Sequence, residues 1–93
     1  MSHKFLIHHI GDSVGVAIAD ISADEAVQGV YLEDDSTILI NSKHDIPLGH
    51  KIALEDITKN SKVIEYRVPI GIATEEIKQG SYVHTHNLKT ARW

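Results

Sequence analysis

Short apolar runs separated by polar turns make up most of this sequence. Six of them are candidate strands: residues 5–8, 14–18, 27–32, 37–40, 62–68 and 81–86. Their Ile and Val content, and the alternation within residues 14–18, are typical of β-strands. The polar segment Glu33–Ser36 joins two of the runs as a hairpin. Helical spacing is weak, so the pattern predicts a mainly β fold with short helical turns only at residues 52–57 and 73–77.

A five-residue pattern, Ala-x-x-acid-Ile, occurs three times in the chain. It covers Ala17–Ile21, Ala53–Ile57 and Ala73–Ile77. The last two copies are followed, at the same distance, by Asn60 and Gly80, which are residues that tolerate a left-handed backbone. Each unit is expected to place a buried Ala, a short turn, an Ile anchor and a tight corner before a strand. Such units favour a compact β fold with internal pseudo-symmetry.

The chain has 93 residues, which is enough for one domain over residues 1–93 with a modest core. The apolar positions of the runs and repeats are expected to fill this core. They are Val14, Val16, Ile18, Ile52, Ile57, Val63, Ile70, Ile77 and Val83.

Composition narrows the classes of function. The net charge is −4, so the chain has no basic field for nucleic acid or an anionic membrane. Cysteine is absent, which excludes a disulfide framework, a Cys-based zinc site and a Cys nucleophile. No apolar run approaches the length of about 18 residues that a membrane span needs, and the N-terminus lacks a signal-peptide pattern. We therefore expect a cytoplasmic protein.

The strongest candidate for chemistry is the segment His84-Thr85-His86-Asn87. In a strand, residues two apart point to the same face, so His84 and His86 would present two imidazoles side by side. Such a pair can ligate a metal, bind a carboxylate or move a proton. A metal site needs a further ligand, which could come from Asn87, a water or another chain. The alternative is a solvated edge strand without chemistry.

Two further pairs of residues are candidates for binding an anion. His50 and Lys51 follow the bend at Pro47 and Gly49 and could hold a substrate carboxylate; otherwise they belong to an exposed loop. Tyr66 and Arg67 could bind an anionic substrate as a phenol–guanidinium pair. Alternatively, Tyr66 is half core and Arg67 is surface.

Four segments resemble the N-terminal domain of the altronate dehydratase family. Residues 46–57 resemble its segment "IP-x-GHK-x-AL-x-DI", and residues 63–73 resemble "VIKYG-x-x-IG-x-A". Residues 77–87 resemble "DI-x-x-G-x-HVH-x-HN", and residues 12–17 are similar to the opening "DNVAVAL". Together they cover nearly the whole chain in the same order and spacing.

The resemblance implies a SAF-like domain of β-clip fold and a lyase that performs β-elimination on a hydroxy-acid. The family includes altronate and galactarate dehydratases and (2R)-sulfolactate sulfo-lyase, whose small (alpha) subunit is a separate chain. The opening and the ending at residues 89–93 look most like that subunit. A larger catalytic partner subunit is then implied, the chain alone should be inactive, and a homo-oligomer is possible.

The matching positions carry the implied roles. His84 and His86 would be catalytic or metal-binding, and substrate would contact His50, Lys51, Tyr66 and Asn87. The implied cofactor is a divalent metal such as Fe²⁺, Mn²⁺ or Mg²⁺, shared with or held by the large subunit.

The chain departs from the family pattern at the second segment, because Lys-Tyr-Gly is replaced by Glu65-Tyr66-Arg67.

The alternative to a lyase subunit is a non-enzymatic SAF-like module for carbohydrate or sugar-acid binding or for assembly.

Overall fold

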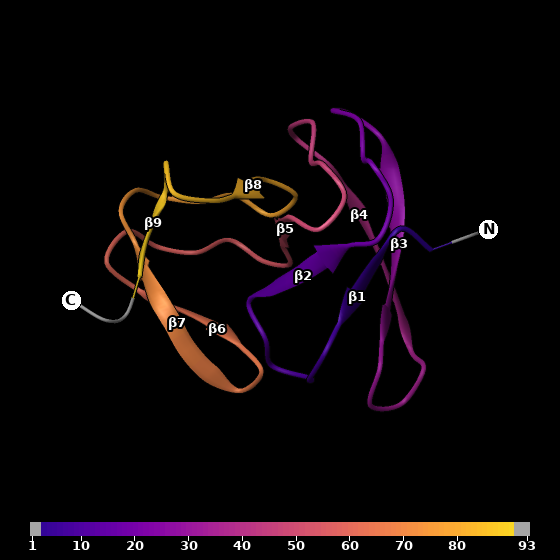
Figure 1. The fold of residues 1–93 in the computed structure, drawn as a ribbon, viewed down its shortest axis with the longest axis horizontal. Helices are drawn as coiled ribbons and strands as arrows, with labels where there is room; N and C mark the ends of the chain where they lie inside the picture. Colours follow the sequence, from indigo (N-terminus) through magenta and orange to yellow (C-terminus); the bar gives the residue numbers. More distant parts are fainter. Residues whose placement is uncertain (1–2, 91–93) are drawn as a thin grey trace.

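The computed structural model describes residues 3–90, and within this range it contains nine strands and no helical turn (Figure 1). The strands are β1 (Phe5–Ile7), β2 (Val14–Ala17), β3 (Ala26–Tyr31), β4 (Thr37–Asn41), β5 (Lys51–Ala53), β6 (Lys62–Glu65), β7 (Val68–Ala73), β8 (Tyr82–Val83) and β9 (Leu88–Thr90). The predicted mainly β fold is therefore confirmed.

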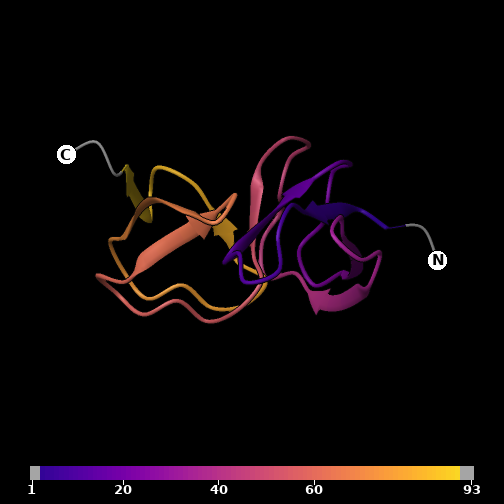
Figure 2. The same cartoon turned by 90° about the horizontal axis from the view of Figure 1, so that it is seen from below.

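The strands form two sheets that lie side by side (Figures 1 and 2). The larger sheet has the order β4-β3-β1-β2-β5-β8, and the smaller one has the order β6-β7-β9. Only the β1–β3 pair is parallel; the other neighbours are antiparallel. The two-strand end of the larger sheet, β5 and β8, lies between the two halves of the molecule.

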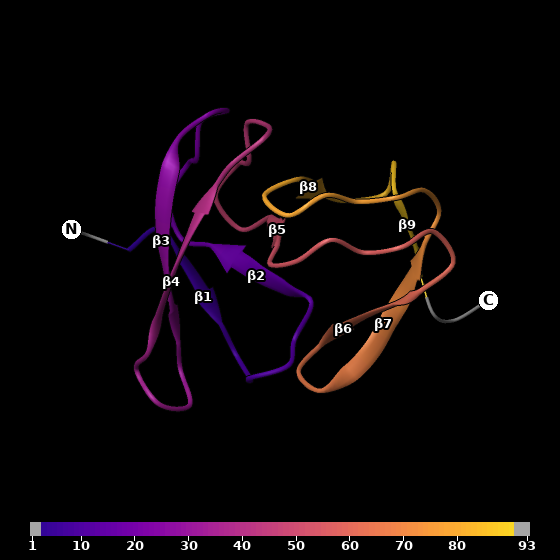
Figure 3. The same cartoon turned by 180° about the vertical axis from the view of Figure 1, so that it is seen from behind.

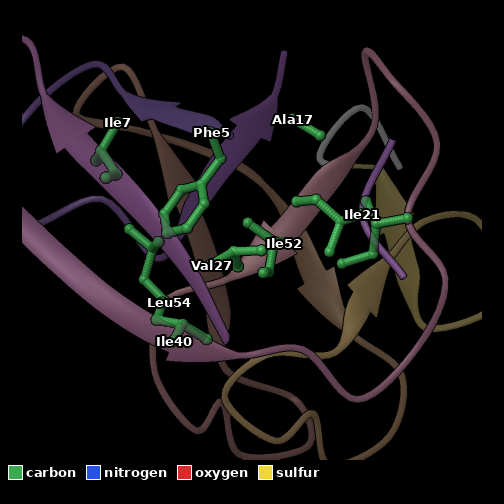
Figure 4. Packing of buried hydrophobic residues seen from close by; sticks show 9 residues of the cluster. Phe5, Ile7, Ala17, Ile21, Val27, Ile40, Ile52 and Leu54 are labelled. Carbon is green, nitrogen blue, oxygen red and sulfur yellow. The ribbon is translucent and has the colours of Figure 1, made fainter. Parts of the chain in front are cut away.

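Each half has its own apolar core, and β5 contributes to both. Ile52 packs with Phe5, Val27 and Ile40 in the first cluster, part of which is seen in Figure 4. The next residue, Ala53, belongs to the second cluster, because successive strand residues point to opposite faces. That second cluster also contains Val14, Ile57, Val63, Ala73, Ile77 and Val83.

The repeated unit is a corner, and corners associate in pairs. Ile21 and Ile46 exchange both backbone hydrogen bonds (2.9 and 2.8 Å), and Ile57 and Ile77 do the same (2.7 and 2.8 Å). The residue three positions after each Ile has a positive φ: Asp24 (65°), Gly49 (87°), Asn60 (73°) and Gly80 (88°). The sequence pattern missed the corner at Ile46, because Ser42 stands where the other copies have Ala.

The acidic residue recurs in front of the Ile because its carboxylate has a structural role. In three corners its carboxylate accepts a backbone N–H from the opposing corner: Leu48 to Asp20, Ala23 to Asp45 and Gln79 to Asp56, at 2.8–2.9 Å. Three of the four corners thus repeat the same contact, which agrees with the predicted pseudo-symmetry.

Several expected elements are wrong in detail. Residues 52–57 and 73–77 are not helical, because each begins as the end of a strand and then enters a corner whose Ile pairs across to another corner. The run 62–68 is two strands, since the chain reverses at Tyr66 and Arg67. The strand expected over 81–86 ends at Val83.

Most of the expected core positions are buried. Ile18 is 41% exposed because β2 ends at Ala17. Val16 and Ile70 are only partly buried. Within residues 3–90 there is no helix long and apolar enough to cross a membrane.

Candidate functional site

Pairing of β5 with β8 brings together residues that are 30 or more positions apart. Ile52 lies opposite Tyr82 and Lys51 opposite Val83, so the next positions along this antiparallel pair are His50 and His84. The ring centroids of these two histidines are 5.0 Å apart. The sheet register therefore assembles the site.

The phenol of Tyr82 is at the centre of a cluster of imidazoles. Its hydroxyl lies 2.6 Å from Nδ1 of His50. The ring of His84 stacks on Tyr82 with centroids 5.5 Å apart and planes 5° apart. The ring of His86 lies 5.6 Å from that of Tyr82 at an angle of 51°. Tyr82, His50, His84 and His86 are called the imidazole–phenol cluster below.

A tight turn after β8 places both predicted histidines. The backbone N–H of His84 donates to Oδ1 of Asn87 (3.0 Å), and Nδ2 of Asn87 donates to the carbonyl of Tyr82 (2.8 Å). The N–H groups of Asn87 and Leu88 both donate to the carbonyl of His84. His84 directly follows β8 and continues its register, whereas His86 reaches Tyr82 through the turn. The two histidines are therefore not placed by alternation along one strand, which corrects the reasoning from sequence.

Asn87 is 3% exposed, and both polar atoms of its side chain are used by backbone groups. A substrate contact would compete with these hydrogen bonds. We therefore assign Asn87 the role of shaping the turn.

A further histidine, His44, supports the cluster from the loop between β4 and β5. The backbone N–H of Tyr82 donates to Nδ1 of His44 (3.2 Å). His44, His84 and His86 are exposed, whereas His50 and Tyr82 are partly buried. The cluster is thus a surface feature, open to a ligand or to another chain.

Lys51 lies beside a carboxylate, whereas His50, its predicted partner in binding an anion, contacts Tyr82. Its ammonium lies 3.8 Å from a carboxylate oxygen of Glu65, which is buried in β6. The family pattern has a lysine at position 65, which would place a second cation near Lys51. The acid found here instead gives Lys51 a partner of opposite charge.

Tyr66 lies in a different place from the imidazole–phenol cluster. It stacks on His8 with ring centroids 4.0 Å apart, at the turn between β6 and β7. Next to it, Arg67 and His9 both contact the carboxylate of Glu33, at 2.7 and 3.1 Å. Figures 1 and 3 show this turn on the opposite edge of the molecule from β8. The structure does not bring Tyr66 together with His50 and His84.

Electrostatics and backbone geometry at this turn are both unusual. Hydrogen bonds from the Ile10 backbone N–H and from Arg67 hold the pKa of the Glu33 carboxyl below its ordinary value. Tyr66 and Arg67 both have positive φ, at 56° and 63°. The buried carboxylate of Asp12 accepts their two backbone N–H groups, at 3.1 Å each, and stabilises the turn.

Sequence reasoning missed Tyr82, His44 and Asp12. A signal existed for Tyr82, because it lies two residues before His84 and occupies the first histidine position of the family's "HVH". His44 and Asp12 act through contacts over long sequence separations, for which the local pattern gives no signal.

The structure also contains a shallow hollow of about 300 Å³ at the first pair of corners. It is lined by Asp20, Ile21, Ser22, Asp45, Ile46 and Pro47 and contains none of the predicted site residues. Its two carboxylates already accept backbone N–H groups.

The described residues do not by themselves complete the predicted metal site. Among residues 3–90, no group of three or more His, Cys, Asp or Glu side chains could hold a metal ion. His84 and His86 therefore do not fit a full ligand set by themselves.

The paired corners and the surface cluster define a small β domain of clip architecture with an imidazole-rich face. Residues 3–91 match the altronate/galactarate dehydratase SAF domain, and the chain belongs to this family. It is 39% identical to the (2R)-sulfolactate sulfo-lyase subunit alpha of Chromohalobacter salexigens over the whole of both chains. The subunit of the same name from Paracoccus pantotrophus is 42% identical over 69% of this chain and 96% of its own length.

Relatives of greater length carry the same domain. The altronate dehydratase of Escherichia coli is 40% identical over 94% of this chain, which spans only 16% of that enzyme.

Proposed function

We propose that this chain is the small subunit of a lyase that eliminates sulfite or water from a hydroxy-acid, together with a larger catalytic subunit. The observation that carries the proposal is the imidazole–phenol cluster, which gathers three histidines on an exposed face. The match to a sulfo-lyase subunit alpha of equal length supports it.

The proposed chemistry suits these side chains. In β-elimination a base removes the proton from the carbon next to the carboxylate. The electron pair of that bond forms the new double bond, and the β substituent leaves with its own electron pair. Imidazole can accept or donate a proton near neutral pH. An imidazole N–H can also donate a hydrogen bond to the substrate carboxylate, where negative charge develops.

The exposure of the cluster suggests how the work is divided. His84 and His86 are exposed, so a second chain would have to cover them to exclude water from the reacting atoms. A divalent metal would acidify the carbon-bound proton, but most of its ligands would have to come from that second chain.

Coexpression of the chain with a larger lyase subunit, sought among the products of neighbouring genes, tests the proposal. We expect the two to copurify through a tag on this chain, and the complex to release sulfite from (2R)-sulfolactate or to dehydrate altronate or galactarate. The 93-residue chain alone should show no turnover. Robust turnover by this chain alone would contradict the division of work.

Variants locate the site in the complex. His84→Ala and His86→Ala should each lower turnover by about a hundredfold without unfolding the chain, as expected for loss of acid–base catalysis. His3→Ala is the matched control, because His3 is exposed and lies outside the cluster. Full activity of both variants would exclude the cluster as the site. Binding of a sugar acid without elimination by the complex would favour the non-enzymatic binding module.

A further inference from the structure

Tyr82 makes the shortest polar contact in the cluster. Its hydroxyl oxygen lies 2.6 Å from Nδ1 of His50, with the two rings edge to face at 64°. The backbone of Tyr82 is held on both sides, since its N–H donates to His44 and its carbonyl accepts from Asn87. The phenol is therefore fixed in place relative to His50.

We infer that Tyr82 is a positioning residue that fixes the tautomer of His50 and makes its Nε2–H a hydrogen-bond donor toward substrate. The tautomer is inferred from the length of the Tyr82–His50 contact, whereas the use of the donor by a substrate rests on the proposed function.

The contact distance indicates the direction of the hydrogen bond. A neutral imidazole ring carries its proton on one nitrogen and accepts with the other. A bond that an N–H group donates to oxygen usually spans about 2.7–3.2 Å, whereas a hydroxyl group, as a donor to oxygen, commonly reaches about 2.5–3.0 Å. A separation of 2.6 Å therefore favours donation by the phenol hydroxyl of Tyr82 to Nδ1 of His50. The ring proton is then on Nε2.

The Nε2 atom is available for a ligand. Among the described residues, the His50 ring makes one hydrogen bond, from Nδ1 to the hydroxyl of Tyr82. Within residues 3–90, every buried side-chain nitrogen or oxygen has a hydrogen-bond partner. Since Nε2 has none and His50 is only partly buried, this nitrogen reaches solvent.

This tautomer separates the roles within the cluster. An Nε2–H group donates to an anionic oxygen of a carboxylate or sulfonate, but it cannot abstract a proton from carbon. His50 is thus a substrate-binding donor, and His84 and His86 remain as the candidates for the base. The family pattern has a histidine at position 82, which has no hydroxyl to impose this direction.

Nuclear magnetic resonance of the full 93-residue chain, labelled with ¹⁵N at histidine, tests the tautomer without any partner. At neutral pH, we expect Nδ1 of His50 to have the shift of an unprotonated nitrogen and Nε2 that of a protonated one. In Tyr82→Phe the shifts of His50 should move toward those of exposed His3, which is an internal reference. A protonated Nδ1 in the unsubstituted chain, or an unchanged His50 spectrum in Tyr82→Phe, would overturn the inference.

Kinetics of the complex test the use of the donor. Tyr82→Phe and His50→Ala should each raise KM about tenfold or more with a smaller change in kcat, as expected when a ground-state contact is lost. The double variant should be no worse than His50→Ala alone, because the two residues act as one unit. Additive losses, or losses confined to kcat, would refute this role. Absence of elimination activity with any partner would instead refute the proposed function and leave the tautomer result standing.

Discussion

Replacement of Asp12 should destabilise the domain more than any other single change of a carboxylate on the described part of the chain. Asp12 is 4% exposed and lies in the loop between β1 and β2. Its two carboxylate oxygens accept three backbone N–H groups, from His9 (3.2 Å), Tyr66 (3.1 Å) and Arg67 (3.1 Å). It therefore links the first half of the molecule to the turn between β6 and β7.

The magnitude follows from these bonds and from the backbone that they hold. Hydrogen bonds to a charged group contribute about 1.5–3 kcal/mol each, but water can replace part of this at Tyr66 and Arg67, which are exposed. Both of these residues also adopt the left-handed conformation, which costs a non-glycine residue roughly 1–2 kcal/mol. We expect Asp12→Ala to cost about 2–4 kcal/mol, and Asp12→Asn to cost about half as much because one acceptor oxygen remains.

Urea unfolding of the 93-residue chain, followed by far-ultraviolet circular dichroism, measures the change in the free energy of unfolding. The matched control is Asp45→Ala, since the exposed Asp45 accepts a single backbone N–H, from Ala23. This control should cost about 1 kcal/mol or less. In thermal unfolding, the loss for Asp12→Ala corresponds to a fall in Tm of about 8–32 °C.

A loss for Asp12→Ala below about 0.5 kcal/mol, or one no larger than that of Asp45→Ala, would refute the argument. It would mean that the turn between β6 and β7 keeps its conformation without the carboxylate.

Three further predictions concern stability. Ile57→Ala and Ile77→Ala should each lower the free energy of unfolding in urea by about 2–5 kcal/mol, because both side chains are buried in the second core. The same change at exposed Ile18 should cost less than about 1 kcal/mol. Equal losses at the three sites would disprove the assignment of Ile57 and Ile77 as anchors. Gly80→Ala should cost more than about 2 kcal/mol, because φ is 88° there and the new Cβ would overlap a backbone oxygen of β4; a stable variant would show that this corner can rearrange. The pKa of Glu33 is lower in the folded state than its usual value of 4.5. Its carboxylate therefore stabilises the fold at pH values above 4.5, and this stabilisation is lost as the pH falls through the folded-state pKa. In Glu33→Gln, the free energy of unfolding measured in urea should therefore fall less steeply as the pH is lowered. An unchanged pH dependence would contradict the role of the Glu33 contacts with Arg67 and His9.

Local patterns in the sequence determined much of the fold. The alternation and the Ile and Val content located β1 to β4 to within a residue at each end. The Ala-x-x-acid-Ile repeat located three of the four corners, because each corner needs a buried Ile and a residue that tolerates positive φ. The histidine motif after Gly80 also supplied two members of the imidazole–phenol cluster, His84 and His86.

Only the tertiary structure decided which residues are neighbours. The sequence predicted a short helical turn at residues 52–57 and another at 73–77, but the backbone of the Ile that ends each segment is paired with a distant corner, which a local pattern cannot show. The register Ile52–Tyr82 places His50 beside Tyr82 and His84, whereas the turn between β6 and β7, to which Tyr66 belongs, lies on the opposite edge of the molecule. Asn87 looked like a ligand, but its amide is used within the turn. Strand pairing over long sequence separations depends on the packing of the whole chain, so the composition of the site emerged only with the fold.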